Sequence, residues 1–306
     1  GDCPENASRR VHRKYVQNDP DNVTVIRQVA LTNESAAAVF LQDGINAACA
    51  ASSGDKTVTI GMMLPPDLKE PEVHAHLERL SKICKKEQIP IPEICITTIP
   101  FLTKPTIQIT VRGTKKRETV PAQGEVLMIG TAAAGGTGIL ATVEKERLCR
   151  TLPEPFVGEA AKMLSSLSVT KTIDAAYRHG ALLCSCPGEG GVFAGLWRLA
   201  SLLSSGIEAD LKAIPIRQES VEICEVFRLN PYQLLSTGCV LVVTKDAEEL
   251  TDALMHEGIR ACPIGKLTAG NERIIQNDGE TRFLDLPGAD EIYRVIYSTK
   301  DGGDNR

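Results

Sequence analysis

The apolar residues of this chain fall into short runs, some alternating with polar residues and others spaced three and four apart. Alternation predicts strands, and the spacing of three and four predicts helices. The segment from Thr106 to Arg112 alternates cleanly, as a half-buried strand does. In the same third of the chain we expect strands at 23–31, 57–64 and 94–98, and helices at 33–52 and 70–88.

A second series of elements begins near residue 126. Val192, Leu196, Leu199 and Ala200 recur at the spacing of one helical face, which predicts a helix with a buried side. The other helices expected here begin at 139 or lie at 159–166, 173–179, 220–229 and 246–256. The expected strands are 126–129, 207–211, 239–244 and 259–267, followed by two strands joined at 277–279 by an Asn-Asp-Gly turn.

The polar stretch 113–123 separates the two series, so we place the linker there. We therefore predict two domains, residues 1–118 and 119–306, which is a reasonable number for 306 residues. Strands and helices alternate irregularly, and the last strands form a hairpin. This order favours an α/β (α+β) fold with mixed sheets over a doubly wound parallel sheet.

Glycines are concentrated between the apolar run 181–183 and the helix that follows it. Gly188, Gly190 and Gly191 would let the backbone approach a ligand, and the helix start would offer N–H groups to an anion. Glu189 would repel a phosphate unless a cation lay between them. A plain turn before a helix explains the same glycines, so the pattern alone does not establish an anion site.

The composition excludes several classes of protein. Lys and Arg number 34 against 39 Asp and Glu, and aromatic residues make up only 4%, which disfavours nucleic-acid binding. No apolar run reaches the length needed to cross a membrane. The ten cysteines lie mostly inside apolar runs, without Cys-x-x-Cys pairs, as free thiols do in a reducing compartment. We expect a cytoplasmic protein without zinc.

Five stretches of the second half resemble the AIR synthase-related (PurM-like) superfamily, and within it the hydrogenase-maturation (HypE-type) branch. Together they cover roughly residues 122–297, and they are specific in combination. They are Gly136-Thr137 with 139–141, Glu189-Gly190-Gly191 with the helix to 204, 214–219, 229–238 and 265–268.

This resemblance implies an N-terminal α/β domain whose strands build a β-barrel across a homodimer, and a C-terminal α/β sandwich. It also implies an ATP site between the domains, where magnesium and acidic side chains hold the phosphates. Family enzymes use ATP to activate an amide, carbonyl or similar oxygen. The residues that the resemblance assigns to the cofactor are Asn46, Gly135, Gly136, Thr137, Gly188, Gly190 and Gly191.

The chain departs from the family pattern where the pattern is acidic. The family loop reads roughly Asp-x-Thr-Glu-Gly-Gly, whereas residues 186–191 read Cys-Pro-Gly-Glu-Gly-Gly. Asn46 is followed by Ala47 where the family has Asn-Asp, and the Gly-Gly-x-Thr turn is missing at 93–96. The remaining metal candidates are Asp2, Asp43 and Glu189, and the candidate catalytic residues are Glu189 and Cys186.

Three hypotheses remain open at this stage. The first is a dimeric module that keeps the fold, binds a nucleotide or another anion, and has weak or no ATPase activity. The second is an ATP-dependent enzyme with altered magnesium ligands. The third is a thiol-based activity at Cys184 and Cys186, which occupy the place of the family's catalytic loop.

Overall fold

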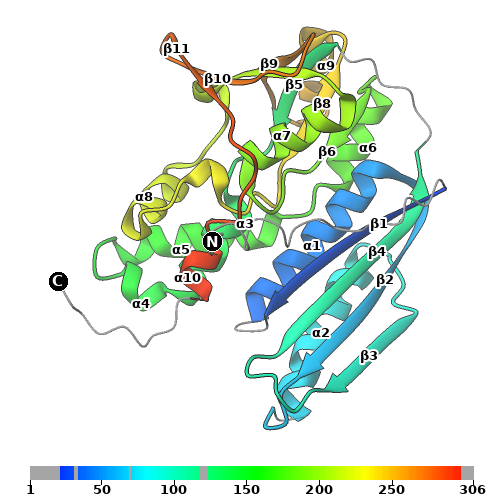
Figure 1. The fold of residues 1–306 in the computed structure, drawn as a ribbon, viewed down its shortest axis with the longest axis vertical. Helices are drawn as coiled ribbons and strands as arrows, with labels where there is room; N and C mark the ends of the chain where they lie inside the picture. The colour runs from blue at the N-terminus through cyan, green and yellow to red at the C-terminus, as the bar shows by residue number, and fades with distance from the viewer. Residues whose placement is uncertain (1–20, 31–33, 69, 117–122, 298–306) are drawn as a thin grey trace, which may run out of the picture.

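The computed structural model describes residues 21–30, 34–68, 70–116 and 123–297. They form two sheets, one of four strands and one of seven, with helices packed against both (Figure 1). This arrangement confirms the predicted mixed α/β fold class. Among the described residues, no helix is long and apolar enough to cross a membrane.

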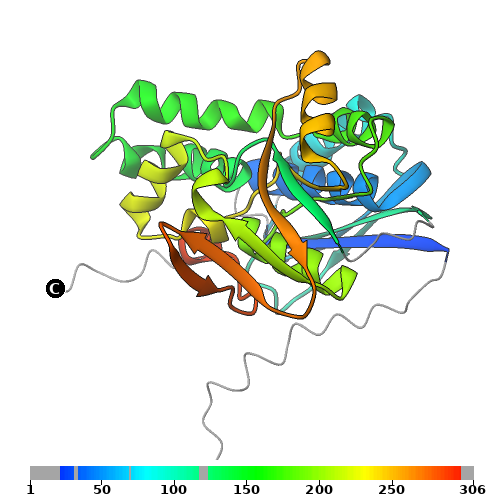
Figure 2. The ribbon, with the colours of Figure 1, turned by 90° about the horizontal axis from the view of Figure 1, so that it is seen from above.

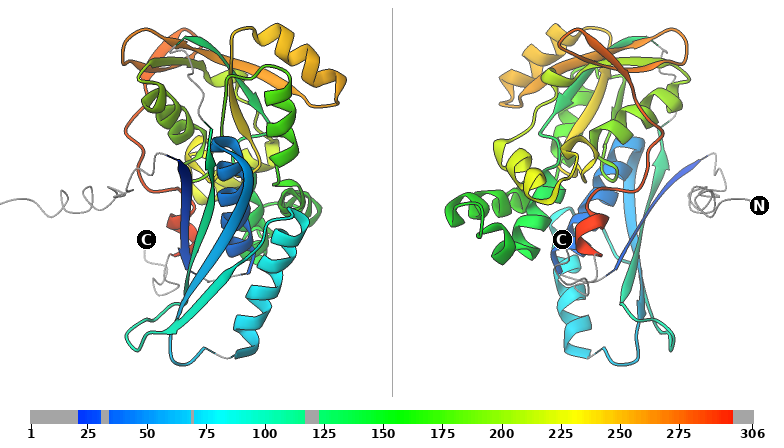
Figure 3. Two further views of the ribbon diagram at one scale, coloured as in Figure 1. Left: turned by 90° about the vertical axis from the view of Figure 1, so that its right-hand side faces the viewer. Right: turned by 60° about the vertical axis from the view of Figure 1, so that its left-hand side comes forward.

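The smaller sheet belongs to the N-terminal half and has the strand order β1-β4-β2-β3. Only β2 and β3 run parallel, and β4 pairs antiparallel with β1 and β2. Figure 3 shows α1 and α2 on the same side of this sheet. The elements are β1 (Asn22–Ala30), α1 (Glu34–Ala51), β2 (Ser52–Leu64), α2 (Glu70–Lys86), β3 (Glu93–Thr98) and β4 (Thr106–Lys115).

The larger sheet has the order β11-β10-β7-β9-β5-β8-β6, in which only β7 and β10 pair in parallel. The β10–β11 hairpin forms one edge of it (Figure 2). The strands are β5 (Gly124–Ile129), β6 (Leu183–Ser185), β7 (Gly206–Asp210), β8 (Val240–Thr244), β9 (Ala261–Thr268), β10 (Arg273–Asn277) and β11 (Glu280–Phe283).

The helices of this half precede, separate and follow these strands. The α-helices are α3 (Ala134–Val143), α4 (Lys145–Leu148), α5 (Glu154–Lys162), α6 (Thr170–Arg178), α7 (Gly191–Leu203), α8 (Gln218–Phe227), α9 (Ala247–His256) and α10 (Tyr293–Ile296). The short 3-10 helices are η3 (Met163–Ser166), η4 (Leu211–Ala213) and η5 (Pro231–Gln233).

Helices cover both faces of the larger sheet, which explains why its central strands are apolar without alternation. Val126 and Met128 of β5 pack in one core with Leu196 of α7. Leu127, the residue between them in sequence, packs in another core with Leu250 of α9. The predicted buried face of α7 is confirmed, because Val192, Leu196, Leu199 and Ala200 are each at most 1% exposed.

A third core joins the two halves of the chain. Phe40 of α1 and Ile109 of β4 belong to the same cluster as Ile139 of α3, Ile223 of α8 and Ile292 before α10. The helices α1 and α3 are therefore packed together in a core that they share with the smaller sheet and α8. The division into domains at residue 118 stays a prediction.

Some predicted boundaries were wrong. The sequence placed 113–123 in a linker, but β4 continues to Lys115 as the partner of β1 and β2. A helix was expected from residue 139, yet α3 begins at Ala134 and contains Gly135 and Gly136 in its first turn. The β-barrel across a homodimer stays a prediction, and the described sheet of the single chain is open, with β1 and β3 as its edges.

Gly136 is buried, and Leu234 leaves no room there for a side chain. A Cβ added there would overlap Cγ of Leu234, whereas a Cβ at Gly158 in α5 would meet nothing within 4 Å. We predict that Gly136→Ala lowers the free energy of unfolding by about 1–3 kcal/mol through overpacking. Gly158→Ala, the matched control, should raise it by about 0.5–1 kcal/mol because glycine is unfavourable inside a helix. Urea denaturation measures both, and equal stabilities would contradict the packing argument.

Candidate functional site

The predicted glycine loop connects β6 to α7 and lies against α1. Gly188, Gly190 and Gly191 have φ angles of 54°, 83° and 69°, which are left-handed conformations that favour glycine. A Cβ at Gly188 would lie 2.5 Å from Oδ1 of Asp43, and a Cβ at Gly191 would overlap the carbonyl oxygen of Tyr232. Backbone geometry and close contacts therefore both require these glycines.

Asp43 is a buried carboxylate beneath this loop, with an exposure of 0%. Nε of Arg27, on β1, donates a hydrogen bond to Oδ2 at 2.6 Å, and Oγ1 of Thr237 donates to Oδ1 at 3.0 Å. Burial acts to lower the pKa of Arg27, but the charge and hydrogen bond of Asp43 raise it on balance. Arg27, whose side chain is 14% exposed, is therefore a fixed positive charge at the site.

Glu189 is held on two sides. Arg198 of α7 donates to the carbonyl oxygen of Glu189 at 3.1 Å and also to that of Pro187. The Tyr293 hydroxyl donates to Oε1 of Glu189 at 2.9 Å. Burial raises the pKa of Tyr293, as does the charge of Glu189, so the phenol keeps its proton and remains a donor.

A second buried carboxyl group, that of Asp290, lies against the start of α7. Asp290, 2% exposed, accepts hydrogen bonds from the backbone N–H of Gly190 at 2.6 Å, of Leu235 at 3.1 Å and of Ile292 at 2.9 Å. Burial raises the pKa of Asp290 to about 7, against the opposing effect of these hydrogen bonds. The sequence suggested that the Gly190 N–H donates to a bound anion. In the structure it donates to the Asp290 side chain of the same protein.

Cys186, next to the loop, is a thiol whose surroundings disfavour the reactive form. Burial is the main cause that raises the pKa of the Cys186 thiol well above its usual value, and the charge of Asp43 adds to it. The thiolate, which is the nucleophilic form, is therefore disfavoured. The nine described cysteines are all free, and the described residues contain no group of three or more His, Cys, Asp or Glu that could hold a metal.

Asn46, predicted to bind the cofactor, connects α1 to the chain before α6. It is 1% exposed, donates to the carbonyl oxygen of Leu167 at 2.8 Å, and accepts from the Val169 N–H at 3.2 Å. It also accepts from Gln42 at 3.1 Å. The acidic residue of α1 that contacts the loop is Asp43, three positions before Asn46.

The remaining candidates lie in α3, where Gly135 packs against Thr237, or outside the described residues. Thr137 is buried in α3 and donates to the hydroxyl of Ser220 in α8 at 2.9 Å. Gly135 and Gly136 precede it in the same helix and are also buried. Asp2 lies outside the described residues. The structure therefore brings together Asp43, Cys186 and the residues of the glycine loop.

A cleft of about 540 Å³ opens beside the loop, between the start of α7, η5 and the segment 282–291. Gly190 reaches its wall, and the rings of Phe193 and Tyr232 stack there with centroids 5.2 Å apart. Sequence reasoning missed this cleft, as it missed Arg27 and Asp290. The apolar residues Phe283, Leu284 and Leu286, at the end of the last hairpin and just after it, were its one signal in the sequence.

The fold and this loop define a known class of protein. Residues 123–277, about half of the chain, match the family described as AIR synthase related protein, C-terminal domain. The chain belongs to the AIR synthase-related family, as the sequence motifs predicted.

Particular relatives fall in the HypE branch. The carbamoyl dehydratase HypE of Rhodobacter capsulatus is 29% identical over 114 residues, which are 35% of this chain and 34% of that protein. The chain thus matches about a third of the length of this curated relative. In structure it is similar to a HypE–HypF complex chain, with a TM-score of 0.68, 15% identity, and coverage of 92% of this chain and 98% of that one. A HypE in complex with ATP gives a TM-score of 0.65, 14% identity, and coverage of 88% and 87%.

We predict that the Arg27–Asp43 pair is a main stabilising contact of the site. Arg27→Met leaves the Asp43 carboxylate buried without its cation and should cost about 3–5 kcal/mol of unfolding free energy. Adding Asp43→Asn should restore part of that loss, because the uncompensated charge is gone. Arg112→Met, on an exposed position of β4, is the control and should change stability by less than about 0.5 kcal/mol. Additive effects of Arg27→Met and Asp43→Asn in guanidinium denaturation would rule out the pairing.

Proposed function

We propose that this protein is a HypE-like member of its family that no longer uses magnesium and acts as a dimeric nucleotide- or anion-binding module with weak or no ATPase activity. The Arg27–Asp43 ion pair carries the proposal, because it puts a protein cation against the buried acid of the loop. Of the site residues assigned from the sequence, Gly188, Glu189 and Cys186 surround that pair.

The acidic side chains around the loop are a poor fit to a magnesium ion. Magnesium requires near-octahedral oxygen ligands, usually one or two carboxylates together with water and phosphate. Both oxygens of Asp43 already accept hydrogen bonds, from Arg27 and from Thr237. Glu189 accepts from Tyr293, and Asp290 accepts three backbone N–H groups. A metal would have to displace these partners.

The arginines of the site support binding of an anion without a metal. Arg27 is a fixed charge beneath the loop, and Arg198 holds the loop from the side of α7. The cleft next to Gly190 offers stacked aromatic rings to a planar group. A HypE of similar fold binds ATP, which makes a nucleotide the first candidate ligand.

The alternative function is an ATP-dependent enzyme that phosphorylates an amide- or carbonyl-type oxygen with altered magnesium ligands. This alternative is favoured by the extent of the structural match to HypE proteins, because the match includes both halves of the chain. It requires that nucleotide binding frees Glu189 or Asp43 from its present partners. The two proposals differ in whether magnesium changes nucleotide affinity and whether ATP is turned over.

Titration calorimetry with ATP separates these proposals. If the protein cation has replaced the metal, ATP should bind with the same affinity in magnesium and in EDTA, and turnover should stay far below about 1 per second, the low end of ordinary enzyme rates. Adenosine without phosphates is the control and should bind more weakly in both buffers. Binding that requires magnesium, or turnover near about 1 per second, would establish the alternative instead.

We also propose a homodimer formed through the N-terminal strands. In the described part of the chain no helix covers the face of the smaller sheet opposite α1 and α2, and Ile26 on β1 is 36% exposed there. Both edge strands, β1 and β3, are open in the single chain. An assembly that covers this face would bury these groups.

Light scattering of the purified protein should give twice the 33.0 kDa mass of one chain. Ile26→Glu should shift the protein toward monomer at micromolar concentration, because a charge would be buried in the interface. Phe283→Glu, at a 68% exposed apolar position on β11, serves as the control and should leave the mass unchanged. A monomer mass for the unmodified protein would refute this interface.

A further inference from the structure

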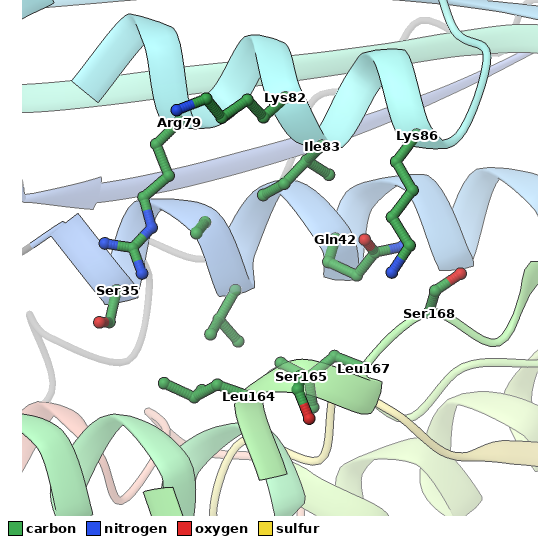
Figure 4. Close-up of a pocket in the computed structure, with 12 residues that line it drawn as sticks. Ser35, Gln42, Arg79, Lys82, Ile83, Lys86, Leu164, Ser165, Leu167 and Ser168 are labelled. Carbon is green, nitrogen blue, oxygen red and sulfur yellow. The ribbon is translucent and has the colours of Figure 1, made fainter. Parts of the chain in front are cut away.

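The structure contains cavities with different linings. A cavity of about 280 Å³ lies between α1, α2 and the segment 164–168, and none of its twelve described lining residues is aromatic (Figure 4). The cleft of about 540 Å³ beside Gly190 is larger and is lined by three aromatic side chains, those of Phe193, Tyr232 and Phe283. A volume of this size suits a small molecule, so the composition of the walls indicates which kind of molecule binds there.

The aromatic residues of the cleft come from three separate elements. Phe193 lies in the first turn of α7, Tyr232 in η5 and Phe283 at the end of β11. The rings of Phe193 and Tyr232 stack with an interplanar angle of 12° and pack against the core of the larger sheet. Core packing explains these two rings, but it does not explain Phe283 and Leu286, which line the cleft and are 68% and 74% exposed. Stacked rings beside an open cleft favour a planar ligand.

The charged side chains that line the cleft are paired, with one exception. Arg282 donates to Glu280 at 3.0 Å. Glu291 accepts from Arg294 at 2.7 Å. The remaining charged residue of the lining is Asp285, which is exposed and has no partner among the described residues. The described lining therefore carries one unpaired negative charge and no unpaired positive charge.

Two neutral polar side chains of the cleft are also available to a ligand. In the described part of the chain, the side-chain amides of Gln233 and Asn277 have no hydrogen-bond partner, although both line the cleft. Each amide can accept through its oxygen, and the ionised Asp285 carboxylate can only accept. The free polar groups of the walls therefore favour a ligand that carries N–H donors.

A phosphate or carboxylate would fit this cleft poorly. It would face the Asp285 carboxylate, and the described lining offers no unpaired cation to offset the repulsion. Arg27 and Arg198, which support the anion proposed above, do not line the cleft. A nucleotide would engage the loop through its phosphates, so their charge does not determine what the cleft binds.

We propose that this cleft binds a small aromatic amine, which is a planar ring that carries a protonated amino group. The ring would lie against Phe193 and Tyr232, and the ammonium group would pair with Asp285. Aromatic rings attract a cation over their faces, which adds to the same preference. The amide oxygens of Gln233 and Asn277 would accept the remaining N–H groups of the ligand.

Titration calorimetry of the full chain with matched probes tests the proposal. Tryptamine, tryptophol and indole-3-acetate share the indole ring, and at neutral pH they are positive, neutral and negative. Tryptamine should bind at least about fivefold more tightly than tryptophol, which is the effect of one ion pair in water-like surroundings, and indole-3-acetate should bind most weakly. Hexylamine has the charge without the ring and should bind more weakly than tryptamine. Equal affinities for tryptamine and tryptophol, tighter binding of indole-3-acetate or hexylamine, or no binding of tryptamine would overturn the proposal.

Variants then locate the site. Asp285→Asn removes the charge at an exposed position and should weaken tryptamine binding at least about fivefold, while leaving tryptophol binding unchanged. Asp252→Asn, at an exposed position of α9, is the matched control and should change neither affinity. Phe193→Leu should weaken binding of both probes, because it removes one ring of the stack. Equal effects of Asp285→Asn and Asp252→Asn, or full binding by Phe193→Leu, would place the amine elsewhere on the protein and rule out this site. Thermal melting verifies that each variant is folded.

Discussion

The contact between Arg27 and Asp43 is the constraint on which the arrangement of the site depends. A carboxylate with no exposure is costly unless it is paired and hydrogen-bonded. Its three neighbours come from distant parts of the chain, namely Arg27 of β1, Thr237 before β8, and the loop at Gly188. The same carboxylate thereby ties the smaller sheet, α1 and the C-terminal half together. Gly188 has to be glycine partly because this acid lies directly against it.

The other polar groups of the loop are satisfied in the same way, by the protein itself. Asp290 accepts the Gly190 N–H, Tyr293 donates to the Glu189 side chain, and Arg198 holds the Glu189 carbonyl oxygen. In an open site, these polar groups would instead be free to bind a phosphate, a metal or water. A site closed by internal partners is well ordered before any ligand arrives, and a ligand must compete with those partners. Because the carboxylates already have internal partners, this site is better suited to binding by fixed charges than to metal-dependent chemistry.

Sequence periodicity predicted much of the fold, because most of the elements bury one regular face. The apolar spacing of α7 and the alternation of β4 each correspond to one buried side. Gly135 and Gly136 were misplaced because glycine disfavours helices on average, whereas α3 needs small residues to approach Leu234 and Thr237. The spacing of apolar residues cannot identify Arg27 as a site residue, because a single cation in a strand usually lies on a solvated face. Its partner lies 16 residues away, and Thr237 lies 194 residues from Asp43.

The helix α1 makes contacts with several distant parts of the chain from one element. Asp43 pairs with Arg27 and lies against the glycine loop, Asn46 holds the segment that leads into α6, and Gln42 donates to Asn46. Gly188 has no side chain to separate the loop from the Asp43 carboxylate. Consecutive turns of a single helix therefore join the smaller sheet, the glycine loop and the segment before α6.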